Sequence, residues 1–81
     1  MERTDVMAKV QDIFCNILDN EDIQLTDATT AEDIEEWDSL THIQLIKAIE
    51  KDFSIRFTSR EILSWNNVGE MIDSIVVKVK V

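Results

Sequence analysis

The sequence predicts an all-α fold: a four-helix bundle with three longer helices, a short third helix and a long loop between helices one and two. Two observations predict this class. Apolar residues recur at the spacing of an amphipathic helix in three stretches, and the 81 residues contain no proline and one glycine, so helix breakers are almost absent. A chain of this length buries one modest core, and we therefore expect a single domain over residues 1–81.

The first helix is expected over residues 4–18, with Thr4 available as an N-cap. Its apolar side chains follow the i, i+3, i+4, i+7 pattern, which places them on one face of a helix. They are Val6, Val10, Ile13, Phe14, Ile17 and Leu18.

The segment from residue 19 to residue 38 loses this period. Threonine and aspartate cluster there as turn formers, while Ile23, Leu25 and Ile34 supply apolar anchors, so we expect a long loop held against the core. A loop of this length in a compact domain calls for a function or for a hidden short helix, for which residues 31–35 are the best place.

Helical periodicity returns over residues 39–52, where we expect the second helix to bury a stripe of branched aliphatic side chains. The short third helix is expected over residues 59–63. The last two helices each begin with an oxygen-bearing cap three residues before an acid that reaches back, in the pairs Thr58 with Glu61 and Asn67 with Glu70.

The fourth helix is expected to continue into the terminal sequence VVKVKV. This run alternates with period two, but an isolated strand has no partner here, so we interpret it as a helical tail. The inner face of this helix is predicted to consist of Val68, Met71, Ile72, Ile75 and Val76.

The net charge of -9 resides in one segment, because residues 19–38 hold nine acidic residues and no lysine or arginine. Its field repels nucleic acid and anionic lipid and attracts basic protein surfaces, so we expect a basic protein partner and no nucleic acid. The same segment also fits an acidic loop that only keeps a small protein in solution.

Other classes of protein and site are disfavoured by the composition. No stretch approaches the roughly 20 apolar residues of a membrane span, and the first residues lack the apolar region of a secretory signal. We therefore expect a cytoplasmic protein. One cysteine and one histidine provide neither an internal disulfide nor a zinc site of soft ligands, and we expect no metal site.

The most informative residues are Trp37, Asp38, Ser39 and Leu40, where the acidic loop meets the second predicted helix. A helix N-terminus offers unpaired backbone N–H groups and a positive dipole end, which favour a phosphate ester on the Ser39 hydroxyl. The same spacing also fits an aspartate or a serine that only caps the helix. Both interpretations stay open at this point.

With its neighbours, this motif resembles the acyl carrier proteins, and the resemblance runs without gaps over about residues 34–75. The first helix and the loop also agree in length and apolar pattern, so nearly the whole chain is covered. The matching residues after the Trp-Asp-Ser-Leu motif are Ile43, Leu45, Ile46, Ala48, Ile49, Glu50, Phe53, Ile55, Phe57 and the run from Asn67 to Asp73.

The resemblance implies that Ser39 carries 4′-phosphopantetheine, attached from coenzyme A by a phosphopantetheinyl transferase, with Asp38 and Leu40 at the attachment site. The thiol of this arm would hold an acyl or aminoacyl group as a thioester. A loading enzyme and downstream synthases would be the other partners, and the carrier itself would not be an enzyme. The Met1 start and the absence of linker sequence favour a freestanding carrier, which we expect to be a monomer.

Two further sets of residues follow from the resemblance. The partner-contacting residues are predicted to be Glu35, Glu36, Trp37, Leu40, Ile43 and Lys47. The acyl cleft is predicted to be lined by Ile46, Phe57, Ile62, Trp65 and Ile72.

The chain also departs from the fatty-acid carriers. Their second helix is usually strongly acidic, whereas this one is nearly neutral, which favours polyketide, nonribosomal peptide or cell-surface pathways over general fatty acid synthesis. Ile62 and Trp65 are larger than is common at their positions, and we infer short or polar cargo. The residues that make the second helix nearly neutral are Thr41, Gln44, Lys47 and Lys51.

Two other functions compete with the carrier. A hydrolase built from Ser39, His42 and Asp38 is disfavoured, because neighbours on one helical turn cannot form the line of nucleophile, base and orienting acid. The alternative that remains is an unmodified acidic helical adaptor, in which Ser39 is only a cap and the acidic segment binds a basic protein partner.

Overall fold

The computed structural model describes residues 2–79 and confirms the predicted all-α class, with four helices in this part of the chain. They are α1 (Arg3–Ile17), α2 (Ser39–Phe53), the short α3 (Ser59–Ser64) and α4 (Val68–Val79). Among the described residues, no helix has both the length and the apolar character that a membrane crossing requires.

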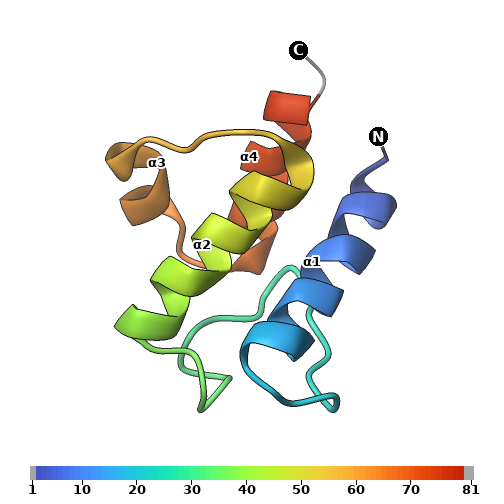
Figure 1. The fold of residues 1–81 in the computed structure, drawn as a ribbon, viewed down its shortest axis with the longest axis vertical. Coiled ribbons are helices and arrows are strands. Elements are labelled where there is room, and N and C mark those ends of the chain that lie inside the picture. Colours follow the sequence, from blue (N-terminus) through green and yellow to red (C-terminus); the bar gives the residue numbers. More distant parts are fainter. Residues whose placement is uncertain (1, 80–81) are drawn as a thin grey trace.

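Helix α1 forms the centre of the bundle because it packs against both α2 and α4. It runs in the direction opposite to these two helices (Figure 1). The side chains with almost no exposed surface lie between these elements and include Val6, Val10, Phe14, Leu45, Ile49, Val68, Met71, Ile72 and Ile75. All nine fall on the apolar faces that the helical spacing predicts.

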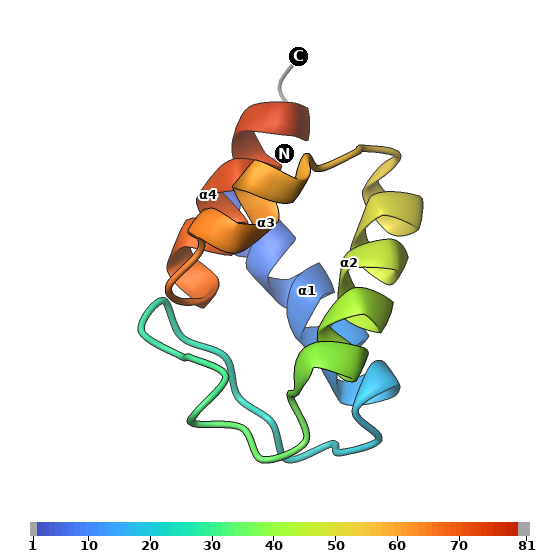
Figure 2. The same ribbon diagram turned by 90° about the vertical axis from the view of Figure 1, so that its left-hand side faces the viewer.

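The long loop before α2 is fixed to the bundle, as predicted. It crosses the end of the bundle where α1 finishes and α2 and α4 begin (Figure 2). Ile23, Leu25 and Ile34 are only 6%, 8% and 8% exposed, so the three apolar anchors are buried. The free energy gained by burying these side chains offsets the conformational entropy that is lost when a segment without regular structure is held in one conformation.

The loop also provides partners for the start of α4. The Val68 N–H donates to the Thr29 carbonyl at 2.8 Å, and the Gly69 N–H donates to the Asp27 carbonyl at 2.9 Å. These N–H groups belong to the first turn of α4 and have no acceptor within the helix. The loop backbone therefore acts as the cap of α4.

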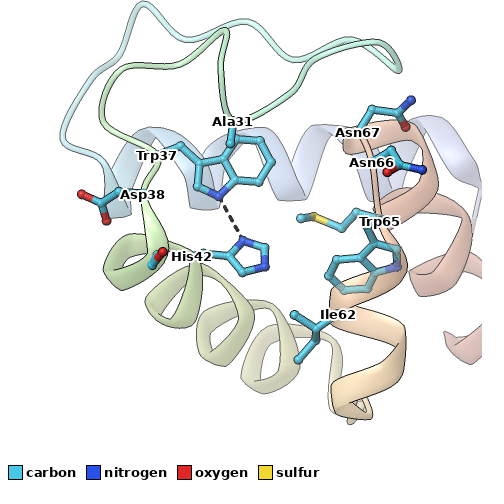
Figure 3. A pocket seen from close by; sticks show the side chains of 10 residues that line it. Ala31, Trp37, Asp38, His42, Ile62, Trp65, Asn66 and Asn67 are labelled. Carbon is cyan, nitrogen blue, oxygen red and sulfur yellow. Dashed lines mark hydrogen bonds between the residues drawn. The ribbon is translucent and has the colours of Figure 1, made fainter.

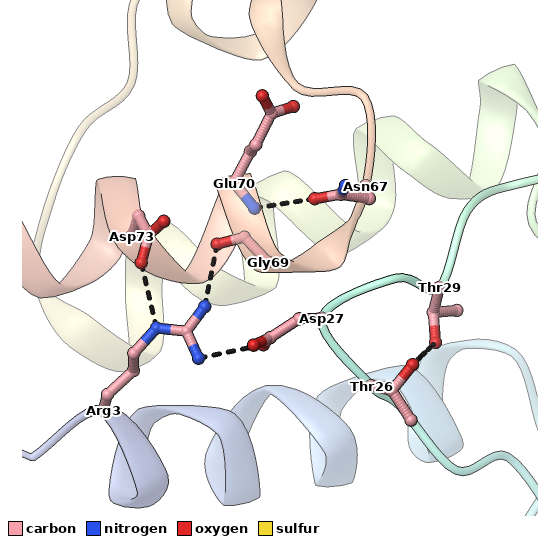
Figure 4. A network of polar contacts seen from close by, with 8 residues as sticks. All are labelled: Arg3, Thr26, Asp27, Thr29, Asn67, Gly69, Glu70 and Asp73. Carbon is pink, nitrogen blue, oxygen red and sulfur yellow. Dashed lines mark hydrogen bonds and ion pairs between the residues drawn. The ribbon is translucent and has the colours of Figure 1, made fainter.

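Arg3 connects three segments at this junction (Figure 4). Its guanidinium contacts Asp73 on α4 and Asp27 in the loop, both at 2.9 Å, and it donates to the Gly69 carbonyl at 3.2 Å. The carboxylates are largely exposed, so this network orients the loop more than it stabilises the fold.

Two predictions about the first half of the chain are wrong. Thr4 is not the N-cap of α1, because the helix begins at Arg3 and the cap position is Glu2, which makes no side-chain capping bond. Residues 31–35 form turns and no helix. Here the Asp33 carboxylate accepts from the Thr30 N–H at 2.9 Å, and this side-chain bond closes a local turn in place of a helical one.

The predicted caps of the later helices are largely confirmed. Thr58 and Glu61 form a reciprocal capping box at α3. At α4 the Glu70 N–H donates to the Asn67 side-chain oxygen at 2.9 Å, but the Glu70 carboxylate accepts from the N–H of Asn66, not from that of Asn67. Helix α4 continues through Val79, as predicted for the tail, whose residues 80 and 81 lie outside the described part.

Candidate functional site

The N-terminus of α2 is capped by two residues that leave Ser39 free. Asp38 is the N-cap, and its carboxylate accepts from the Thr41 N–H at 2.9 Å. The Thr41 hydroxyl in turn accepts from the Asp38 N–H at 2.8 Å, which completes a capping box. The sequence analysis did not predict that Thr41 takes part in this box. The available signal was the spacing, since Thr41 lies three residues after Asp38.

Ser39 is therefore not the cap of α2. It is the first residue of the helix, it is exposed, and its hydroxyl makes no hydrogen bond to any other residue of the described chain. The hydrogen bond from the Thr41 N–H lowers the pKa of the neighbouring Asp38 carboxyl, so this group is ionised at neutral pH. The site thus presents a free hydroxyl next to a carboxylate and a helix N-terminus.

A pocket of about 430 Å³ opens beside Ser39 (Figure 3). It lies between the start of α2, the loop, α3 and the segment that leads into α4. Its lining is mostly aromatic and apolar, with two amide side chains at one side: Ala31, Trp37, Asp38, Ser39, His42, Ile62, Trp65, Asn66, Asn67 and Met71.

Aromatic rings form a continuous row through this region. Trp37 makes an edge-to-face contact with Phe14 of α1, with ring centroids 4.9 Å apart, and it stacks on His42 with centroids 5.8 Å apart. His42 then meets Trp65 edge-on at 6.5 Å, and Trp65 meets Phe57 edge-on at 4.9 Å. The row fixes the walls of the pocket, because edge-to-face and offset contacts restrict how each ring can rotate.

His42 has one ring nitrogen engaged within this row. Its Nδ1 accepts a hydrogen bond from the Trp37 Nε1–H at 3.0 Å. Burial lowers the pKa of His42, so the ring is neutral at pH 7. Because Nδ1 is the acceptor, it is not available as a base toward Ser39, which agrees with the argument against a hydrolase.

The structure brings some of the predicted cleft residues to the pocket and excludes others. Ile62 and Trp65 line it, and Phe57 supports Trp65 from behind. Ile46 and Ile72 are 6% and 0% exposed on the inner faces of their helices and do not line this pocket, so their place in an acyl cleft stays a prediction. Sequence reasoning missed the pocket-lining residues Ala31, His42, Asn66, Asn67 and Met71.

The predicted partner-contacting residues of α2 share one face of the helix. Leu40 and Ile43 are 68% and 55% exposed, and Lys47 is exposed one turn later. Residues spaced by three and four positions lie on one side of a helix. We call Leu40, Ile43 and Lys47 the α2 face.

The predicted loop residues differ in exposure. Glu35 and Glu36 are exposed next to the start of α2, whereas Trp37 is 8% exposed. The Trp37 ring packs inward on Phe14, and its contact with partners stays a prediction. Leu63 on α3 is 84% exposed and was not predicted as a contact. The available signal was the pair of adjacent apolar residues Ile62 and Leu63. Neighbouring positions on a helix point to different sides, so when Ile62 lines the pocket, Leu63 is left exposed.

Comparison with known proteins identifies the family. Residues 8–75 match the family described as "Phosphopantetheine attachment site". The chain has a TM-score of 0.88 and 35% identity with the solution NMR structure of the holo acyl carrier protein from Geobacter metallireducens, covering 93% of this chain and 86% of that one. The chain therefore belongs to the phosphopantetheine attachment family and is a carrier protein of the acyl carrier type.

One curated relative is a much longer protein. The chain is 28% identical over 71 residues to the non-reducing polyketide synthase pkdA of Emericella nidulans, a match that covers 88% of this chain and 3% of the synthase. The chain thus spans only a small part of this relative's length.

Family membership defines the cofactor and the type of activity. The group is 4′-phosphopantetheine, held covalently, and the carrier has no catalytic function of its own. A free, exposed hydroxyl at a helix N-terminus fits this group, because a phosphodiester is favoured beside unpaired N–H groups. Within the described residues, no cluster of three or more histidine, cysteine, aspartate or glutamate side chains is arranged to hold a metal ion.

Proposed function

We propose that Ser39 is the residue that carries the 4′-phosphopantetheine arm, and that the arm holds acyl or aminoacyl intermediates as thioesters for pathway enzymes. The observation that carries this proposal is the free Ser39 hydroxyl. Asp38 and Thr41 form the capping box of α2, so Ser39 is not needed as a cap, and it is exposed. Its hydroxyl also borders the aromatic pocket.

A carrier of this kind needs a rigid anchor and a flexible arm. The α2 N-terminus is rigid because of its capping box, and the arm would keep its cargo at high effective concentration near any enzyme bound to the same carrier. Asp38, ionised and adjacent, is positioned to help a phosphopantetheinyl transferase orient the reacting groups.

The likeness to part of a polyketide synthase and the nearly neutral α2 support a specialised biosynthetic pathway. We propose that the transferase, a loading enzyme and downstream synthases bind the α2 face together with the exposed acids Glu35 and Glu36. The exposed leucine and isoleucine would supply the apolar contact. The surrounding charges would set the association rate and its salt dependence.

We also propose that residues 1–81 form one carrier domain that works as a monomer in the cytoplasm. The described helices share one continuous core, which supports a single domain. Coenzyme A, the source of the arm, is available in the cytoplasm.

The attachment is tested by the intact mass of the protein after incubation with coenzyme A, magnesium and a broad-specificity transferase. We expect one phosphopantetheine-sized gain in the wild type and no gain in Ser39→Ala. Ser59→Ala is a matched control, because Ser59 is also exposed and is also the first residue of a helix, directly after the N-cap of α3. It should gain the full mass.

Two results would overturn the proposal. A gain in Ser39→Ala would place the arm on another residue. No gain in the wild type with several active transferases would favour the unmodified acidic adaptor, and a search for basic partners would follow.

A further inference from the structure

His42 and Ser39 lie on the same side of α2. They are three residues apart, which places them one above the other on a helix, and both line the pocket. A group attached to Ser39 that folds back into this pocket therefore passes the His42 ring.

The protonation state of this ring is fixed by Trp37. A neutral histidine has one N–H donor and one acceptor nitrogen. The Trp37 Nε1–H occupies Nδ1 as its acceptor at 3.0 Å, so the proton of the ring lies on Nε2. Trp37 cannot easily turn away, because it is 8% exposed and makes an edge-to-face contact with Phe14.

The Nε2–H has no acceptor among the described residues. No buried side-chain nitrogen or oxygen in this part of the chain lacks a partner, so Nε2 is in contact with solvent and not sealed in the core. The ring lies between Trp37 and Trp65, on the wall of the pocket (Figure 3). The pocket thus contains a fixed hydrogen-bond donor with apolar walls on both sides.

A saturated acyl chain is a poor occupant of such a pocket. Where its methylene groups lie against the ring, they would cover the Nε2–H and offer no acceptor at that place, and a polar group buried without a partner is costly. A carbonyl oxygen on the cargo would satisfy the donor, while Trp65 and Ile62 pack against its carbon atoms.

We propose that the His42 Nε2–H donates to a carbonyl of the carried group, so that the pocket favours short β-keto-acyl cargo over saturated cargo of equal length. His42 is then a positioning residue that determines cargo preference. This inference rests on the proposed attachment to Ser39 and deepens it by naming the class of cargo.

The test compares three forms of the protein: the arm alone, a butyryl thioester and an acetoacetyl thioester. The two acyl groups have the same chain length and differ by one keto oxygen. Intact mass first shows that Ser39 is loaded, so a failure of attachment is detected before the pocket is examined.

The first readout is NMR of ¹⁵N-histidine protein. The acetoacetyl form should move the His42 Nε2–H resonance downfield and give nuclear Overhauser contacts between cargo and the Trp65 ring. The butyryl form should resemble the arm alone. If the arm alone causes the full shift, its own amide carbonyls are the acceptor and the assignment to cargo is wrong.

The second readout is transfer of each acyl group from the arm to an added small thiol, cysteamine, which releases the free thiol of the arm; the rate is normalised to that of the same thioester of coenzyme A. A hydrogen bond of ordinary net strength should slow transfer from the acetoacetyl form about fivefold more than that from the butyryl form. His42→Phe, which keeps a ring but has no donor, should abolish the difference. His42→Gln keeps a donor near the position of Nε2 and should restore part of it.

The control is Gln44→Ala, at an exposed position on another side of α2, which should behave as the wild type. Equal protection of the two cargoes, or full protection in His42→Phe, would overturn the inference and leave the attachment to Ser39 untouched. If His42→Phe does not fold, the NMR comparison of the two cargoes on the wild type decides the question.

Discussion

Replacing Gly69 with alanine should destabilise the protein, although alanine is the better helix former. Gly69 is the second residue of α4 and is buried against the loop. A Cβ atom built on it would lie 2.9 Å from the Asp27 carbonyl oxygen, 3.0 Å from the Asp27 Cβ and 3.2 Å from its Cα. Two of these three atoms are backbone, so a side-chain rotation cannot remove the clash.

The magnitude follows from what must move. Overpacking costs about 1–3 kcal/mol, and weakening the hydrogen bonds from Val68 and Gly69 to the loop costs about 0.5–1.5 kcal/mol each. Against this, glycine to alanine gains at most about 1 kcal/mol in a helix interior and less near its first turn. We expect a net loss of about 2 kcal/mol in the free energy of unfolding. For a domain of this size, that corresponds to a fall in Tm of roughly 10 °C.

Urea denaturation followed by circular dichroism measures this loss, with an unchanged m-value as evidence that the transition stays two-state. Val77→Ala is the control, because Val77 is on the same helix and 64% exposed, and it should change stability by less than about 0.5 kcal/mol. A Gly69→Ala variant as stable as the wild type would refute the reasoning, since it would mean that the loop does not press on α4.

Two further predictions concern charge. Burial lowers the pKa of His42, so the folded state binds fewer protons than the unfolded state, and stability should fall as the pH drops through the ordinary histidine value of about 6.5 toward the lower pKa of the folded state. Hydrogen bonds lower the pKa values of Asp38 and Glu61, whose contributions are lost only at more acidic pH, so urea midpoints in this window isolate His42. An equally steep fall in His42→Gln would contradict this. Lys47→Glu on the α2 face should speed association with a basic transferase about twofold to fivefold at low salt and have little effect at high salt, as stopped-flow mixing would show. A change independent of salt would contradict it.

Local patterns in the sequence were sufficient to predict the helices. Helical spacing and caps depend on residues within a few positions of one another, which is why α2 begins at Ser39 and α3 follows Thr58, as expected. The prediction of a short helix at residues 31–35 was wrong because contacts other than helical hydrogen bonds decide the structure of this segment. The Asp33 carboxylate accepts a hydrogen bond from the Thr30 N–H, and the Ile34 side chain is buried in the core. The spacing of apolar residues does not predict either contact.

The candidate site also has a part that the sequence predicts and a part that it does not. The motif around Ser39 is continuous in sequence and could be predicted, and the exposure of Leu40 and Ile43 follows from their place on α2. The pocket could not be predicted residue by residue, because its walls come from the loop, α2, α3 and the start of α4.

The sequence by itself determined the helical class, which depends on short-range spacing, and its resemblance to the carrier family marked the candidate attachment serine. Only the tertiary structure decided that Trp37, Ile46 and Ile72 are buried, and that His42 accepts from Trp37 at Nδ1 and lines the same pocket as Ser39. These facts depend on contacts between segments far apart in the chain. Such contacts are fixed by how the helices and loop share one core, and no local pattern encodes them.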